Sequence, residues 1–177
     1  MFLYLAMIDS DADKSKFEIL YSEYKNLMYY TANRILRNSS DAEDVVHQAF
    51  LKVIEILDTI SSPRCHKTRA LLVTITEHKA IDLYREKQRR NVLPLAEEYI
   101  GAAPAAEIER LAERDTLAAA IASLPPRYRS VLLLRYDCSY SNAEIPNILD
   151  TTEPNVRKLI QRAKEKLSAA LSGMEEP

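Results

Sequence analysis

The chain has 177 residues, of which 47% are hydrophobic, so it can bury the core of one larger or two small domains, and we expect two. Its 2 glycines, Gly101 and Gly173, exclude a glycine-rich phosphate loop and a dinucleotide-binding fingerprint, and its 2 cysteines and 3 histidines have no metal-ligand spacing, so we expect no metal and no cofactor. The net charge of −2 at pH 7 becomes informative only when it is divided along the chain.

The chain begins with an apolar run over residues 2–8. The run lacks a basic flank and a small-residue cleavage site and stops at the acidic Asp9-Ser10-Asp11, so it does not predict a signal peptide. No segment approaches the length of a transmembrane helix, and we expect no membrane insertion and a cytoplasmic location, with which free thiols agree.

Two amphipathic helices are predicted next. Residues 16–37 carry apolar side chains at spacings of three and four, and we expect the aromatic ones in the core. After a break at Asn38-Ser39, Ser40 and Glu43 form a capping box that opens a helix over residues 40–57. Its inward positions are Ala42, Val45, Val46, Ala49, Phe50, Val53 and Leu57.

The outer face of the helix over 40–57 holds Asp44, His47, Gln48 and Glu55, with Glu43 nearby. Residues 1–63 contain 6 Lys/Arg against 10 Asp/Glu, a net charge of −4. These side chains are either ordinary solvated residues or an acidic docking strip, and spacing alone does not decide between the two.

A polar loop over 59–67 leads to Thr68, which we expect to cap a helix running to about Arg90. Residues 64–92 contain 8 Lys/Arg against 3 Asp/Glu, a net charge of +5. The basic cluster at the end of this helix can neutralise phosphates, although a helix C-terminus also favours cations for structural reasons. The cluster consists of Arg85, Lys87, Arg89 and Arg90.

Residues 93–106 lack periodicity and contain Pro94, Gly101 and Pro104, which predicts an interdomain linker. A helix over 107–123 follows, and Leu124-Pro125-Pro126 ends it and starts another. Strand-like alternation is absent from the whole sequence, so the predicted fold class is all-α.

The C-terminal part predicts a helix-turn-helix. Ser141 and Glu144 form a capping box for a first short helix, and Asp150-Thr151 form the turn. Thr152 then caps a second helix that has Glu153 and Pro154 in its first turn. Two features fit less well: Pro146 falls inside the first helix, and Asp150 occupies a turn position that glycine adopts most easily.

The second of these helices separates its side chains by face. Val156, Leu159, Ile160, Ala163 and Leu167 fall on one side, and long hydrogen-bonding side chains fall on the other. Such a face suits the major groove of DNA, although an ordinary amphipathic helix has a similar pattern. The outward residues are Arg157, Lys158, Gln161 and Arg162.

Three motifs stand in a fixed order: DAEDVV at 41–46, AIDLYR at 80–85, and LPPRYR at 124–129 with the helix-turn-helix after it. In this order the chain resembles an extracytoplasmic-function sigma factor of bacterial RNA polymerase, over roughly residues 17–167. The resemblance implies a helical domain over 14–92, a linker over 93–106 and a helix-turn-helix domain over 107–171. It also implies a non-enzymatic subunit that directs transcription initiation, with core RNA polymerase and promoter DNA as partners and an anti-sigma factor as a further candidate.

The resemblance assigns residues to three sites. Binding to the polymerase clamp falls to Glu43, Asp44, His47 and Gln48. The promoter −10 element falls to Arg64, Lys67, His78, Arg85, Lys87, Arg89 and Arg90. The −35 element falls to Asn155, Arg157, Lys158, Gln161 and Arg162. Leu71 stands where the family often has tryptophan, so we expect duplex opening to depend on capture of a flipped base by the loop 61–67.

Two other interpretations remain open from the residues alone. A helix-turn-helix regulator that binds an operator without polymerase would use the N-terminal half for dimerisation or sensing, and a palindromic site would favour it. A purely structural helical protein would leave the basic clusters unexplained.

Overall fold

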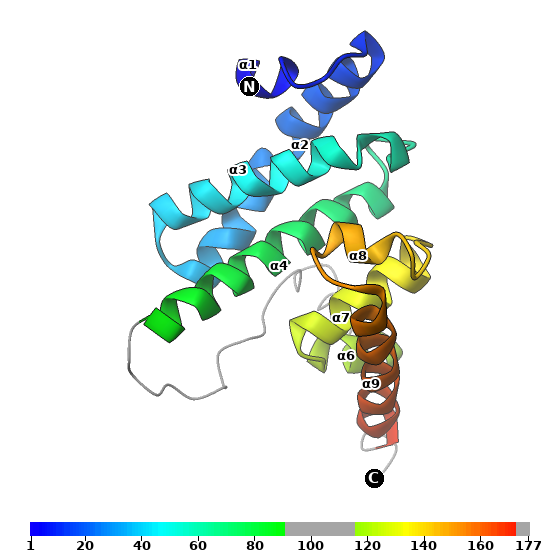
Figure 1. The fold of residues 1–177 in the computed structure, drawn as a ribbon. Coiled ribbons are helices and arrows are strands. Elements are labelled where there is room, and N and C mark those ends of the chain that lie inside the picture. The colour runs from blue at the N-terminus through cyan, green and yellow to red at the C-terminus, as the bar shows by residue number, and fades with distance from the viewer. Residues whose placement is uncertain (91–115, 173–177) are drawn as a thin grey trace. The chain divides into compact units, whose positions relative to one another are not determined.

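The computed structural model describes residues 1–90 and 116–172. Two compact units, Met1–Leu93 and Pro94–Pro177, divide the chain (Figure 1). The regular elements within the described ranges are all helical, so the all-α prediction is confirmed. The predicted linker 93–106 and residues 107–115 of the next predicted helix lie outside the described residues.

The first unit is built on three long helices, α2 (Asp11–Leu36), α3 (Ser39–Glu55) and α4 (His66–Arg90), which all pack against one another (Figure 1). A short helix α1 (Phe2–Leu5) precedes them, and a 3₁₀ turn η1 (Leu57–Thr59) follows α3. The core contains all seven inward positions predicted for residues 40–57, among them Phe50, which is fully buried, although α3 ends at Glu55 and Leu57 lies in η1.

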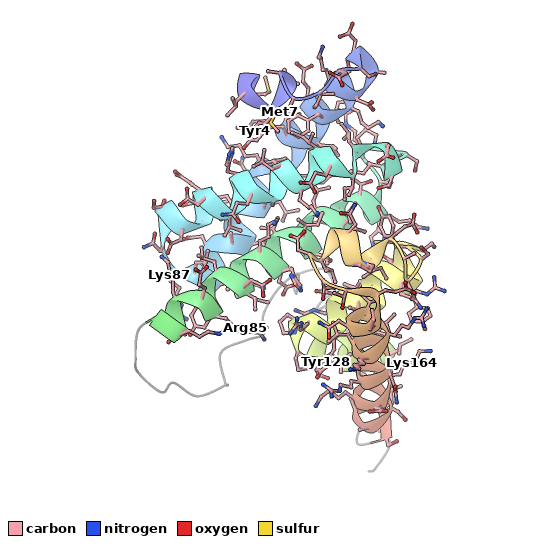
Figure 2. All side chains as sticks on the ribbon, viewed as in Figure 1. Tyr4, Met7, Arg85, Lys87, Tyr128 and Lys164 are labelled. Carbon is pink, nitrogen blue, oxygen red and sulfur yellow. The ribbon has the colours of Figure 1, made fainter. Side chains whose placement is uncertain are left out.

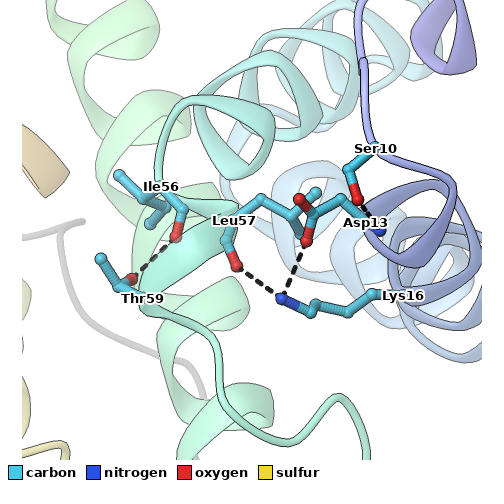
Figure 3. A network of polar contacts seen from close by, with 6 residues as sticks. All are labelled: Ser10, Asp13, Lys16, Ile56, Leu57 and Thr59. Atoms are coloured by element: carbon cyan, nitrogen blue, oxygen red, sulfur yellow. Dashed lines mark hydrogen bonds and ion pairs between the residues drawn. The ribbon is translucent and has the colours of Figure 1, made fainter.

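Helix α2 begins five residues earlier than the sequence predicted, because Ser10 caps it. The Asp13 backbone N–H donates to Ser10 Oγ at 3.4 Å. Lys16 Nζ then donates both to Asp13 Oδ1 at 3.1 Å and to the Leu57 carbonyl oxygen at 3.2 Å (Figure 3). The Lys16 side chain therefore joins the start of α2 to the turn that follows α3.

Two predicted caps are wrong. Helix α3 is capped by Asn38, whose side chain accepts a hydrogen bond from the Asp41 backbone N–H at 3.1 Å, so Ser40 already lies within the first turn. Helix α4 begins at His66, before Thr68, and the Thr68 N–H donates to Cys65 Sγ at 3.4 Å. In both cases a side chain that precedes the predicted cap accepts a hydrogen bond from an otherwise unpaired N–H group of the first turn.

The second unit consists of α6 (Thr116–Ser123), α7 (Pro126–Leu132), the π-helical turn η3 (Leu133–Asp137), α8 (Ile145–Ile148) and α9 (Glu153–Ser172). Helix α9 packs against α6, α7 and α8. Val131, Leu134 and Ile145 are fully buried in this core together with Val156 and Ala163 of α9.

Helices α8 and α9, together with the turn between them, form the helix-turn-helix. Both hydrogen bonds of the predicted capping box are present, because Ser141 N–H donates to Glu144 Oε2 at 2.7 Å and Glu144 N–H donates to Ser141 Oγ at 3.3 Å. The predicted cap position is wrong, because α8 begins only at Ile145, directly after Glu144. Pro146 lies in the first turn of α8 and not in its interior, so it disrupts no helical hydrogen bond. Asp150 adopts a left-handed conformation with φ of 46°, which an aspartate tolerates better than most residues do.

Candidate functional site

The acidic strip of α3 consists of Glu43, Asp44, His47 and Gln48. All four residues are exposed, whereas the opposite side of the helix is buried against α2 and α4. The strip is therefore available to a partner. It points outward because the apolar residues of α3, which recur every three or four positions, are buried on the opposite side of the helix.

One member of the acidic strip has a partner that the sequence did not predict. The Tyr4 hydroxyl, from α1, lies 2.6 Å from His47 Nδ1. Tyr4 is only 7% exposed, and its ring packs against those of Phe17, Tyr21 and Phe50 as well as His47. Burial, with a smaller contribution from Tyr21, raises the pKa of the Tyr4 hydroxyl above its ordinary value. The apolar run at residues 2–8 therefore belongs to the fold of the first unit.

The predicted −10 residues do not form one surface. Arg85 and Lys87 lie on opposite sides of α4, as two residues spaced by two must on a helix (Figure 2). Lys87 forms an ion pair with Asp41 at the start of α3. Arg89 is exposed, Arg85 is half-buried, and the side chain of Arg90 lies outside the described residues.

The remaining −10 candidates lie near the other end of α4 or on its middle. Arg64 Nη2 pairs with Glu23 Oε1 of α2 at 3.1 Å, and both side chains stay well exposed. Lys67 is exposed in the first turn of α4. His78 is mostly buried, with 12% of its side chain exposed, and its Nδ1 lies 3.3 Å from Asp82 Oδ2. His78 therefore has little surface to offer DNA.

The loop 61–67 is held by contacts with Thr68, in the first turn of α4. The Thr68 hydroxyl donates to the Ser62 carbonyl at 2.6 Å and lies 3.3 Å from Cys65 Sγ. The hydroxyl and then the backbone N–H of Thr68 lower the pKa of the Cys65 thiol from its ordinary value. Ser61, Ser62 and His66 are exposed, so this ordered loop presents polar groups outward.

Leu71 is 2% exposed and packs in the core of the first unit. A side chain this deeply buried is not available as an exposed wedge between bases.

The five predicted −35 residues lie together on the exposed face of α9, and the buried face contains Val156, Leu159, Ile160 and Ala163. Three of the five already have short-range partners. Asn155 Nδ2 donates to Thr151 Oγ1 at 3.1 Å, and Gln161 Nε2 donates to Glu165 Oε1 at 3.1 Å. Arg157 Nη2 pairs with Glu153 Oε1 at 2.6 Å.

These contacts are exposed and each joins residues four apart, two of them within α9 and one from Asn155 back to the turn before it. Each is therefore weak and can be exchanged for a contact to a base. Lys158 and Arg162 add positive charge to the same exposed face. The face can therefore meet both base edges and phosphates in a major groove.

Two lysines near the end of α9 lie over tyrosine rings. Lys164 Nζ is 5.5 Å from the centre of the Tyr136 ring, and Lys166 Nζ is 5.8 Å from that of Tyr128. These contacts connect α9 to η3 and α7 and add to the packing of its buried face.

The described part of the chain contains no cluster of three or more His, Cys, Asp and Glu side chains that could hold a metal ion. Within the same residues, no helix combines the length and the apolar character needed to cross a membrane.

Two family models match the chain. Residues 20–90 match sigma-70 region 2, and residues 114–167 match sigma-70 region 4. The first match contains α3, α4 and most of α2, and the second contains the helix-turn-helix. Together they cover well over half of the chain.

Curated relatives align along nearly the whole length. The chain is 27% identical over 171 residues to the ECF RNA polymerase sigma factor SigW of Bacillus subtilis, covering 90% of each chain. It is 25% identical over 162 residues to the ECF RNA polymerase sigma factor SigL of Mycobacterium tuberculosis, covering 90% of this chain and 91% of the relative.

Two solved structures are also similar. CnrH in complex with the cytosolic domain of CnrY shares 25% identity with a TM-score of 0.39, covering 89% of this chain and 88% of CnrH. The sigma factor RpoE in complex with the anti-sigma factor NepR, from Bartonella quintana, shares 16% identity with a TM-score of 0.40, covering 86% and 94%.

Proposed function

Because the chain belongs to the extracytoplasmic-function sigma factors, non-catalytic subunits that initiate transcription with core RNA polymerase, we propose how its residues divide the work. The acidic strip of α3 binds the polymerase clamp. Its exposure supports this assignment, as does the acidic character of Glu43 and Asp44, which favours a basic or polar partner surface.

The basic side chains of the loop 61–67 and of α4 bind the promoter around the −10 element. Arg85 and Arg89 are four residues apart and so share one side of α4, which supports a joint role in binding phosphates. Arg64 and Lys67 contact DNA from the loop side. Lys87 also contacts DNA, but more weakly, because its ammonium group pairs with Asp41.

Helix α9 reads the −35 element through Asn155, Arg157, Lys158, Gln161 and Arg162. Arginine makes bidentate hydrogen bonds to guanine and glutamine makes them to adenine, each good pair being worth about 1–3 kcal/mol of discrimination. Lysine contributes mainly to phosphate binding, which is independent of sequence.

The single observation that carries this proposal is the order of a region 2 match and a region 4 match in one chain, each containing an exposed candidate face. The test is run-off transcription with purified core polymerase and genomic fragments. Discrete transcripts that require this chain are expected. Core polymerase that gives the same transcripts with and without the chain would refute the proposal.

We further propose a cytoplasmic location, since core polymerase and promoter DNA are the partners. An anti-sigma factor that covers one of the exposed faces is a further proposed partner, and co-purification from cells under non-inducing conditions tests for it. The operator-binding and purely structural interpretations give no account of a region 2 match.

A further inference from the structure

Helix α1 is attached to the first unit by one aromatic anchor. Tyr4 is 7% exposed, and its ring centre lies 5.3 Å from that of His47, 5.4 Å from Phe17 and 5.9 Å from both Tyr21 and Phe50. A helix of four residues has no stability of its own in water. Its position is therefore set by the packing of Tyr4, and Ile8, also 7% exposed, secures the following turn.

With Tyr4 and Ile8 buried, other apolar side chains of this segment are left in solvent. Leu3 is 68% exposed, Met7 is 55% exposed, and Met1 is 46% exposed (Figure 2). Among the residues of 1–90 and 116–172 whose side chains are described, the other exposed large hydrophobic residues are Tyr30, Leu117 and Tyr136. Such clustering of apolar side chains marks a contact surface, and methionine adapts readily to a partner.

This apolar patch adjoins the acidic strip. The bond between the Tyr4 hydroxyl and His47 Nδ1, 2.6 Å long, brings α1 into direct contact with one of the four residues of the strip. A protein surface that covers His47 therefore lies beside α1. Glu43 and Asp44 lie one turn of α3 before His47, and exposed Asp9 and Asp11 directly follow the apolar segment along the chain, so carboxylates accompany the apolar side chains in both segments.

We propose that α1 is part of the polymerase-binding surface, with Leu3 and Met7 packing against an apolar area of core polymerase next to the area that the acidic strip contacts. The inference rests on the proposed role of the strip. Apolar side chains beside carboxylates are complementary to an apolar area of polymerase beside basic side chains. Packing of Leu3 and Met7 against that area buries apolar surface, which the polar residues of the acidic strip do not provide. Tyr4 acts as the positioning residue, because it holds α1 against His47.

The test is the equilibrium dissociation constant of the full-length chain for purified core polymerase, measured by fluorescence anisotropy. The double variant Leu3→Ser/Met7→Ser is compared with Tyr30→Ser, which removes an equally exposed side chain from α2. We expect the double variant to bind about tenfold more weakly and the control to bind within about twofold of the natural chain. Circular dichroism before and after heating checks that both variants keep the helical fold.

Asp44→Arg is measured in parallel and separates the two proposals. If Asp44→Arg weakens binding and the double variant does not, the inference about α1 is wrong and the role of the strip stands. If Asp44→Arg has no effect while the double variant weakens binding, the role of the strip is wrong and α1 remains a contact. Tighter binding by the double variant would show that α1 obstructs polymerase, which also overturns the inference.

Discussion

At the scale of single residues, hydrogen bonds lower the pKa of two side chains, the carboxyl of Glu144 and the thiol of Cys65. Ser141 donates to Glu144 and lowers the pKa of its carboxyl, and Thr68 lowers the pKa of the Cys65 thiol. Each charged form is stabilised by a neighbour within three residues. These shifts are therefore local and should survive changes elsewhere in the chain.

The Cys65 thiol should form its thiolate at a lower pH than an ordinary cysteine. Measured on a Cys138→Ser background by the pH dependence of alkylation with iodoacetamide, the midpoint should lie below the ordinary value of 9.0. Thr68→Val removes the hydroxyl but keeps the backbone N–H, so it should raise the midpoint part of the way back. An unchanged profile in Thr68→Val would contradict the assignment.

Substitutions on the exposed face of α9 should fall into two kinds, those that change base preference and those that only lower the affinity for DNA. Arg157→Ala and Gln161→Ala are expected to relax the preference for particular −35 bases, at a cost of about 1–3 kcal/mol each, whereas Lys158→Ala should weaken all sequences alike. Holoenzyme binding to a promoter library randomised at −35 measures both effects. Uniform weakening by all three variants would reduce α9 to a non-specific contact.

At the scale of elements, the ends of helices follow side-chain acceptors. Asn38 caps α3, and Arg37 before it closes α2 in a left-handed conformation with φ of 51°. The two helices can thus reverse direction within two residues without glycine. This tight reversal sets α3 against α2 and turns the acidic strip outward.

Asn38→Ala should destabilise the first unit by about 0.5–2 kcal/mol, since the Asp41 N–H loses its acceptor. Ser40→Ala is the matched control, and it should change stability by no more than about 0.5 kcal/mol because Ser40 is exposed within the helix. Urea denaturation followed by circular dichroism measures both. Equal losses would restore Ser40 as the cap.

Helix α4 presents its basic residues in two directions, and their effects on DNA binding should differ accordingly. Arg85→Ala and Arg89→Ala should each reduce the slope of log K against log salt for holoenzyme by about 1, without changing sequence preference. Lys87→Ala should change the slope less, because the ammonium group already pairs with Asp41. A larger effect at Lys87 than at Arg85 would show that the ion pair opens when DNA binds.

At the scale of the whole molecule, the charges alternate along the chain. Residues 1–63 carry a net charge of −4, and residues 64–92 carry +5. The acidic part faces a protein partner in the proposed arrangement and repels phosphates until that partner covers it. The holoenzyme should therefore bind promoter DNA more tightly than the free chain does.

We expect the free chain to bind a promoter fragment weakly and with little sequence preference at about physiological salt, and the holoenzyme to bind it tightly. Electrophoretic mobility shift assays with and without core polymerase measure the difference. Tight, specific binding by the chain alone to a palindromic site would support the operator-binding interpretation instead.

The sequence by itself determined the helical fold class, the family and which faces of α3 and α9 point outward. These properties depend on the spacing of apolar residues and on short motifs, which are local along the chain. The predicted domain boundaries and site roles remain predictions. The capping box at Ser141 and Glu144 was predictable for the same local reason.

Only the tertiary structure decided which groups meet across the fold. The anchoring of Tyr4 beside His47, the pairing of Lys87 with Asp41 and the burial of Leu71 join segments far apart in sequence. The caps at Asn38 and Cys65 also depended on geometry, because several nearby acceptors were available to each helix start. Periodicity shows that a side chain faces inward or outward, whereas packing decides what it meets there.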